Sequence, residues 1–339
     1  MPEAHDTVDP LVAMILERLA PTKNRKLVEE LITNTIGLLT DDTATLDLKI
    51  ASAALHEMRD AYRMFQPYRE IPKVTIFGSA RTRPDDPLYA AARDVAHHLA
   101  EAGWMVITGA GPGIMQAGME GAGRDRSIGV SIRLPFEQGA NPVIAGDDKY
   151  VSMKYFFTRK LMLIKESRGF ICLPGGFGTL DETFELLTLT QTGKGVPTPI
   201  VFLDTPGDPY WEAIDTMVKD HLMSRGLVAP ADTELYLVTD SCERAVAEVV
   251  GFYANYDSLR YIGDRLVVRM QQSPTDDQLA QLNDQFGHLC ARRTIERAEP
   301  STIERREHDR VDLARVAFTF AKHGFGDLRN MIDALNSFV

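Results

Sequence analysis

The sequence contains little cysteine and no long apolar run. Its 339 residues include three cysteines, Cys172, Cys242 and Cys290, which lie far apart. An odd number of scattered cysteines indicates no disulfide framework, and we expect reduced, packed thiols. No apolar stretch approaches the ~20 residues of a membrane-spanning helix. Residues 1–9 carry acidic side chains where an export signal would be basic. We therefore expect a cytoplasmic protein with no membrane partner.

Positive charge is also in deficit. The chain has 37 Lys and Arg against 48 Asp and Glu, a formal net charge of -11. This balance argues against nonspecific binding to a nucleic acid polymer, although a local basic pocket for a phosphate remains compatible with it. His97 and His98 are adjacent in a helical pattern and no Cys–His spacing accompanies them, so no metal site is expected.

The remaining composition is that of an ordinary globular protein. The hydrophobic fraction is 44% and the charged fraction 25%, and a chain of this length buries a sizeable core without difficulty. Residues 10–66 repeat apolar side chains at helical spacing, with breaks at Pro21 and at Asp41 and Asp42. We interpret this region as a helical arm packed on the main domain, and its apolar faces favour a homo-oligomer, a dimer or larger.

From Lys73 the pattern alternates between short apolar runs and amphipathic segments. Strands are expected near residues 74–77, 104–107, 128–134, 169–173, 199–203 and 235–238, and helices near 88–102, 114–121, 153–167, 179–191, 208–225 and 242–256. Five or so strands joined by helices predict an α/β fold, a Rossmann-like open parallel sheet flanked by helices. Ligands of such sheets bind beyond the carboxyl ends of the strands.

The last part of the chain has a different pattern. A strand near 266–270, a helix near 276–289, a polar β-like stretch over 294–306, a strand near 311–320 and a final helix near 325–335 suggest a small α+β module. Gly263 and Asp264 are a plausible boundary. The predicted domains are therefore a helical arm (1–70), a Rossmann-like nucleotide-binding catalytic domain (71–262) and a C-terminal module (263–339).

One stretch, residues 168–182, carries the strongest chemical signal. A buried strand over 169–173 runs into Pro174-Gly175-Gly176-Phe177-Gly178 and then into a helical pattern. Three glycines in four positions let the backbone approach a ligand and turn its N–H groups inward, and the helix that follows adds free N–H groups and a positive dipole end. These are the features of a phosphate cradle. The structural alternative is a capping box, in which Thr179 and Glu182 satisfy donors at the helix end.

A second glycine turn, Gly109-Ala110-Gly111-Pro112-Gly113, resembles a dinucleotide fingerprint only in part. The pattern G-x-G-x-x-G requires glycine where Ile114 stands, and Pro135 follows the next strand where an acidic residue would hold the ribose. No Gly-Lys-Ser/Thr closes any turn, so a P-loop is absent. A hydride-transfer enzyme is therefore disfavoured.

Residues 174–182 match the P-G-G-x-G-T-x-x-E signature, and the chain thereby resembles the Lonely Guy (LOG) family. This family contains cytokinin riboside 5′-monophosphate phosphoribohydrolases and related bacterial nucleotide nucleosidases, many still labelled "lysine decarboxylase-like". The family's Arg-Lys pair has its counterpart in Arg159 and Lys160, 23 residues before Glu182. The resemblance covers about residues 73–255, and the flanking regions resemble those of longer bacterial members. Phe156-Phe157-Thr158 stands where plant members read M-H-E, and Ala110 interrupts their triple glycine, which puts a cytokinin substrate in doubt more than the reaction.

The resemblance implies hydrolysis of the N-glycosidic bond of a purine nucleoside 5′-monophosphate, AMP or an N6-modified AMP, to free base and ribose 5-phosphate. It implies no cofactor, and a small-molecule nucleotide as partner. The implied catalytic residues are Glu182, which would stabilise charge on the ribose and activate water, and Arg159, which would clamp phosphate or ribose or orient Glu182. The implied substrate-binding residues are Gly175, Gly176, Gly178, Thr179, Lys160, Gly78, Ser79, Gly109, Gly111 and Gly113.

Two alternatives stay open at this point. A nucleotide-sensing protein without catalysis would use the same cradle to hold a phosphorylated ligand. Decarboxylation with pyridoxal phosphate would need a lysine for a Schiff base, with Lys160 and Lys165 as candidates. For Arg159 and Lys160 the structural alternative is a solvated helix face.

Overall fold

The computed structural model describes residues 10–19, 24–135 and 139–339. The chain divides into two compact units, one up to Arg59 and one from Asp60 onward. The first unit contains α1 (Pro10–Leu19), α2 (Arg25–Thr40) and most of α3 (Thr45–Phe65), which confirms the predicted helices. Among the helices of the described residues, none is long and apolar enough to cross a bilayer.

The predicted break at Asp41 and Asp42 is confirmed, because the chain turns there and Asp42 has a φ of 52°. Pro21 lies outside the described residues. The packing of the arm on the main domain stays a prediction.

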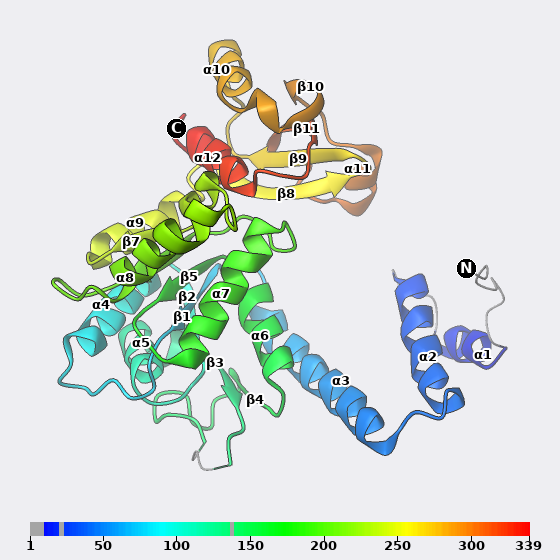
Figure 1. Ribbon diagram of the computed structural model, residues 1–339. Helices are drawn as coiled ribbons and strands as arrows, with labels where there is room; N and C mark the ends of the chain where they lie inside the picture. Colours follow the sequence, from blue (N-terminus) through cyan, green and yellow to red (C-terminus); the bar gives the residue numbers. More distant parts are fainter. Residues whose placement is uncertain (1–9, 20–23, 136–138) are drawn as a thin grey trace. The chain divides into compact units, whose positions relative to one another are not determined.

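The second unit is built on a seven-stranded sheet in the order β4-β3-β2-β1-β5-β6-β7, with every neighbouring pair parallel. Its strands are β1 (Lys73–Phe77), β2 (Met105–Thr108), β3 (Ser127–Ile132), β4 (Tyr150–Met153), β5 (Gly169–Cys172), β6 (Ile200–Leu203) and β7 (Leu237–Thr239). The strand order reverses between β1 and β5, where an open sheet of this kind leaves a crevice for a ligand. The Rossmann-like fold is confirmed (Figure 1).

Both faces of this sheet are covered, which explains why its strands are apolar on both sides. Ile76, Ile171 and Val201 point into a core shared with α4 (Pro87–Glu101), α5 (Ile114–Ala122) and α9 (Cys242–Gly251). On the opposite face Phe77 stacks on Phe170, and Phe202 stacks on Trp211 of α8.

The helices of that opposite face are α6 (Phe156–Lys165), α7 (Phe177–Gln191) and α8 (Tyr210–Met217). Shorter helical turns lie at Gln66–Tyr68, Arg124–Arg126, Val218–Leu222, Met223–Arg225, Pro230–Leu235 and Gly287–Leu289. Cys172 is fully buried and burial raises its pKa to about 12, so the predicted packed, reduced thiol is confirmed.

The prediction missed one strand and misplaced its neighbours. β4 lies in a segment that the sequence suggests is a loop passing into a helix, and α6 begins at Phe156 rather than at residue 153. β4 is four residues long and only Met153 in it is buried, so it lacks the apolar run of an inner strand. The third strand ends at Ile132, two residues early. Residues 136–138, where it was expected to run into a loop, lie outside the described residues.

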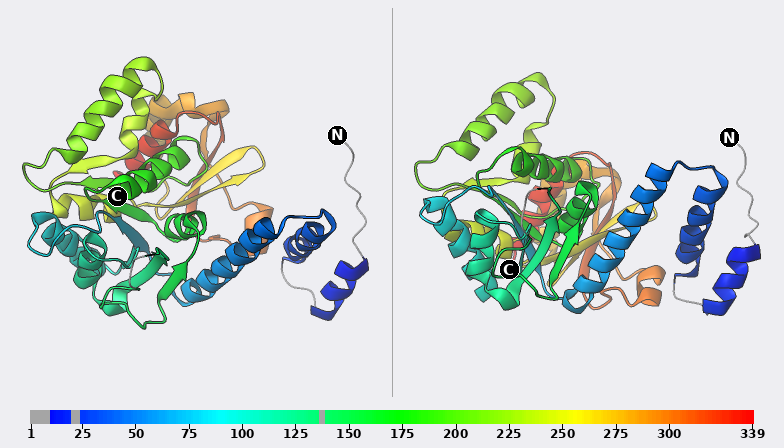
Figure 2. Two further views of the ribbon diagram at one scale, coloured as in Figure 1. Left: turned by 60° about the horizontal axis from the view of Figure 1, so that its bottom comes forward. Right: turned by 90° about the horizontal axis from the view of Figure 1, so that it is seen from below.

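A second sheet, antiparallel and in the order β10-β11-β9-β8, forms the C-terminal part of the chain. It contains β8 (Tyr256–Ile262), β9 (Arg265–Met270), β10 (Cys290–Arg297) and β11 (Ala314–Phe320), with α10 (Asp276–Phe286), α11 (Thr302–Glu307) and α12 (Phe325–Asn336). Figure 2 shows this sheet and α12 from two further directions. The predicted α+β module is confirmed. The ion pair between Arg329 of α12 and Glu248 of α9 joins this module to the layer of helices on the first sheet.

Three details of this part differ from the prediction. β8 begins where a helix was still expected, because α9 stops at Gly251. Gly263 and Asp264 form the turn of the hairpin between β8 and β9, with Ile262 opposite Arg265. The expected β-like stretch 294–306 divides into the end of β10 and the short helix α11. The division into three domains stays a prediction.

Candidate active site

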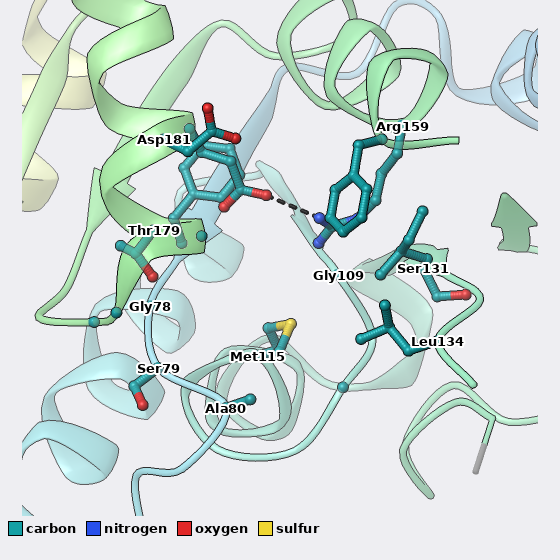
Figure 3. A pocket seen from close by; sticks show the side chains of 18 of the residues that line it. Gly78, Ser79, Ala80, Gly109, Met115, Ser131, Leu134, Arg159, Thr179 and Asp181 are labelled. Atoms are coloured by element: carbon teal, nitrogen blue, oxygen red, sulfur yellow. Dashed lines mark hydrogen bonds and ion pairs between the residues drawn. The ribbon is translucent and has the colours of Figure 1, made fainter. Parts of the chain in front are cut away.

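The glycine turns after β1, β2 and β5 open into one cavity of about 920 Å³ at the carboxyl ends of the strands. Figure 3 shows Gly78, Gly109 and Thr179 around it, with Arg159 facing Thr179 across the space. Ten of the twelve predicted site residues line this cavity: Gly78, Ser79, Gly109, Gly111, Arg159, Gly175, Gly176, Gly178, Thr179 and Glu182. The other two, Gly113 and Lys160, lie behind its wall.

Helix α7 begins inside the glycine turn, with Gly176 as its N-cap and no side chain capping it. The predicted capping box of Thr179 and Glu182 is therefore wrong: Thr179 already lies in the first helical turn, whose amides have no acceptor within the helix. A Cβ on Gly175 would lie 2.2 Å from Thr179 Oγ1, so only glycine lets this hydroxyl sit against the turn. The hydroxyl of Tyr210 donates to the carbonyl of Gly175 over 2.6 Å and holds the turn from the other side.

Glu182 and Arg159 form a buried ion pair in the cavity wall. Arg159 Nη1 lies 2.9 Å from Glu182 Oε1, and the side chains are 10% and 11% exposed. Arg159 Nε also donates to the carbonyl of Val130 at the end of β3, over 3.1 Å. A Cβ on Gly109 would lie 2.3 Å from Arg159 Nη2, so the guanidinium rests directly on the backbone of the β2 turn. A solvated helix face is thus wrong for Arg159.

The electrostatics of Glu182 suit proton transfer. Burial raises the pKa of this carboxyl, the charge of Arg159 opposes the rise, and Asp181 adds to it. A carboxyl group whose pKa is raised takes up a proton at a pH closer to neutrality, as is common for general acids and bases.

Lys160 does not line the cavity, although its partner Asp181 does. Its Nζ lies 3.0 Å from Asp181 Oδ2 and also pairs with Glu185. Burial disfavours the charge of Lys160, but the hydrogen bonds that it donates to Glu185 and Asp181, and the charges of these carboxylates, outweigh burial and raise the pKa of Lys160. Lys165 contacts Glu166 and the ring of Tyr62. Neither lysine that the pyridoxal phosphate alternative needs lines the cavity.

Gly78, Ser79 and Gly113 join the three turns. Ser79 N–H donates to the carbonyl of Pro174 over 3.2 Å, and the carbonyl of Ser79 accepts from Ile114 N–H over 3.0 Å. Gly113 has a φ of 66°, and a Cβ there would lie 2.3 Å from Ser79 O. Gly113 is therefore needed for the close approach of the β2 turn to Ser79, and it does not itself line the cavity.

Several further lining residues were not predicted as site residues. These are chiefly Arg81, Ser131, Arg133, Leu134, Tyr150, Ser152 and Tyr210, together with Phe156, which was noted only as a departure from the plant motif. Most of them lie at the ends of β3 and β4, and β4 was not predicted. Their only signal was the general rule that carboxyl ends of parallel strands share one edge.

Comparison with known proteins places this site in a family. Residues 113–249 match the family model described as "Possible lysine decarboxylase". A probable cytokinin riboside 5′-monophosphate phosphoribohydrolase of Arabidopsis thaliana is 31% identical over 144 residues, which cover 41% of this chain and 68% of that protein. A cytokinin riboside 5′-monophosphate phosphoribohydrolase of Mycobacterium tuberculosis is 28% identical over 163 residues, 47% of this chain and 83% of that protein.

Among solved structures, the Moco carrier protein of Chlamydomonas reinhardtii has a similar fold, and the match covers 53% of this chain and 96% of the carrier protein. The TM-score is 0.37 and the sequence identity 21%.

Proposed function

The chain belongs to the LOG family of phosphoribohydrolases, and we propose that it hydrolyses the N-glycosidic bond of a purine nucleoside 5′-monophosphate. The products are the free base and ribose 5-phosphate. The observation that carries this proposal is the buried pair of Glu182 and Arg159, which lines the same cavity as the uncapped N-terminus of α7.

The N-terminus of α7 supplies the phosphate subsite. Its first-turn amides, from Phe177 to Thr179, have no acceptor within the helix, and the positive end of the helix dipole adds to their attraction for an anion. Thr179 contributes a hydroxyl beside them, fixed against Gly175. A 5′-phosphate bound there carries the ribose toward the middle of the cavity.

The ion pair acts on the ribose. Cleavage of the bond between C1′ and the base develops positive charge on the sugar, and the carboxylate of Glu182 stabilises that charge. Glu182 also takes a proton from the water that adds to C1′, while the bonding electrons leave with the base. Arg159 keeps Glu182 in place, and its charge favours the ionised carboxylate that accepts the proton by opposing the rise in pKa that burial causes.

Base release tests this proposal. The purified chain is incubated with AMP, with N6-isopentenyl-AMP and with adenosine, and free base is separated by liquid chromatography. We expect base from at least one monophosphate and far less from adenosine, which lacks the group that the α7 amides bind.

Glu182→Gln keeps the size of the side chain and removes its charge, so base release should fall at least 100-fold. Glu185→Gln is the matched control, since Glu185 lies one turn further along α7, pairs with Lys160 and is outside the cavity. Full activity of Glu182→Gln would remove this residue from the mechanism. Binding of AMP by calorimetry without base release over hours would favour a nucleotide sensor instead.

A further inference from the structure

Two hydroxyl groups at the far end of the cavity have no part in the mechanism above. Ser131 Oγ lies 2.8 Å from the hydroxyl of Tyr150, and both side chains line the cavity. Ser131 is 7% exposed. The two residues lie on neighbouring strands, where Gly129 is opposite Tyr150 and Ser131 opposite Ser152, so they share one face of the sheet.

Both groups are held in place by packing. The ring of Tyr150 lies over Gly129, where an added Cβ would come within 3.0 Å of it, and it packs against the apolar cluster of Ala110, Met119 and Ile144. Ser131 is fixed by β3 itself, whose preceding residue, Val130, accepts the hydrogen bond from Arg159. The hydroxyl pair is therefore rigid and next to the catalytic pair.

The position of the Ser131–Tyr150 pair relative to the phosphate subsite indicates which part of a bound nucleotide would lie next to it. In Figure 3 Ser131 and Leu134 lie on the same side of the cavity as Arg159, and Thr179 lies on the other side. A nucleotide with its phosphate at Thr179 and its C1′ at Glu182 directs its base toward Ser131. Among the described residues, the carboxylates that line the cavity belong to Asp181 and Glu182, on α7, so the polar side chains on the Ser131 side are hydroxyls and the guanidinium groups of Arg133 and Arg159.

Hydrogen-bond counting gives the pair a function. Two hydroxyl groups have two protons, and the bond between them uses one, whichever group donates. The proton that is left to donate to a ligand belongs to the hydroxyl that accepts this bond, and accepting a hydrogen bond makes that hydroxyl a better donor. A purine that departs from C1′ takes the bonding electrons onto its ring nitrogens, which then become strong acceptors.

We propose that the Ser131–Tyr150 pair donates this hydrogen bond to a ring nitrogen of the departing base and so assists its departure. The inference rests on the proposed function. In this step the bond from C1′ to the base breaks, its electron pair goes to the base, and water supplies the oxygen that C1′ gains. The pair stabilises the developing negative charge on the base without losing its proton to it; the base takes a proton from solvent, and Glu182 returns to solvent the proton that it took from the attacking water.

The test compares two leaving groups in Ser131→Ala and Tyr150→Phe. One substrate is AMP; the other is 4-nitrophenyl β-D-ribofuranoside 5-phosphate, whose nitrophenolate leaves without help from a hydrogen-bond donor. We expect kcat for AMP to fall about tenfold in each variant, the effect of one hydrogen bond, and kcat for the nitrophenyl substrate to stay within twofold. If the nitrophenyl substrate is not turned over, N7-methylated AMP takes its place, because its base is already cationic.

Ser127→Ala is the matched control. Ser127 lies on the same strand, is fully buried and donates to the carbonyl of Gly123 over 2.7 Å, but it is outside the cavity. We expect it to change kcat for the two substrates equally or not at all. A fall of equal size for both substrates in Ser131→Ala, or no fall with AMP, overturns the inference and leaves the proposed function standing. A wild-type chain that releases no base from any nucleotide overturns the proposed function itself.

Discussion

Gly109→Ala is a sharp test of the site because it perturbs the proposed catalytic pair without substituting either member. A Cβ at this position would lie 2.3 Å from Arg159 Nη2 and 2.7 Å from the sulfur of Met115. Non-bonded heavy atoms settle at ~3.5 Å, so the guanidinium must retreat by about 1.2 Å. It cannot do so freely, since Nη1 is bound to Glu182 at 2.9 Å and Nε to Val130 O at 3.1 Å.

A displacement of this size lowers the rate of catalysis substantially. Misplacing a catalytic group by about 1 Å costs roughly 100-fold in rate, which corresponds to ~2.7 kcal/mol. We therefore expect kcat/KM for base release from the preferred monophosphate to fall about 100-fold, measured by steady-state chromatography.

Two other glycines calibrate this result. In Gly111→Ala the new Cβ would meet the terminal methyl of Met115 at 2.7 Å, and an unbranched, flexible side chain moves aside easily, so a fall of about threefold is expected. In Gly251→Ala, at the end of α9, nothing lies within 4 Å of the new Cβ, and activity should not change. Gly109→Ala with activity within about threefold of the wild type would refute the assignment of Arg159.

Two further predictions concern pH and stability. Burial raises the pKa of Glu182, and Glu182 must be ionised to act as a base, so kcat/KM should fall as the pH drops through a value above the usual range of a glutamate. Arg159→Gln removes the charge that lowers this pKa, so the fall in kcat/KM should move to higher pH. A pH–rate profile that does not move in the variant would contradict the coupling between the two residues. In the C-terminal module Arg269 lies 2.7 Å from Glu304, with side chains 4% and 1% exposed. Glu304→Gln should cost ~3 kcal/mol of the free energy of unfolding in urea, whereas Glu307→Gln, in a more exposed pair with Arg260, should cost less than ~1 kcal/mol; equal costs would argue against a buried pair.

The central sheet could be predicted because its inner strands are apolar on both faces. Lys73–Phe77 and Gly169–Cys172 are buried throughout and are followed by glycine turns, so both the apolar run and the turn that ends it predict a strand. Tyr150–Met153 has neither feature, as three of its four residues are only half-buried. It is a strand because β3 offers it a free edge, which is a property of the folded sheet.

The start of α7 shows why local chemistry can mislead. Thr179 and Glu182 have the spacing of a capping box, but the helix begins at Phe177, and the carboxylate of Glu182 turns to Arg159, a partner 23 residues earlier in the chain. The glycines after β5 and Glu182 were identified from a contiguous signature, and Arg159 from its spacing of 23 residues to Glu182. Ser131, Tyr150 and Tyr210 were not, because folding alone brings them to the same cavity. The cytoplasmic location and the homo-oligomer stay predictions.

The measurement that tests the central claim most directly is the product balance with AMP. The chain is incubated with AMP, and free adenine and ribose 5-phosphate are quantified in the same sample, with Glu182→Gln alongside. We predict the two products in equal amounts from the wild type and neither from the variant. Adenine without ribose 5-phosphate, equal yields from the variant, or binding of AMP with neither product formed would contradict the account.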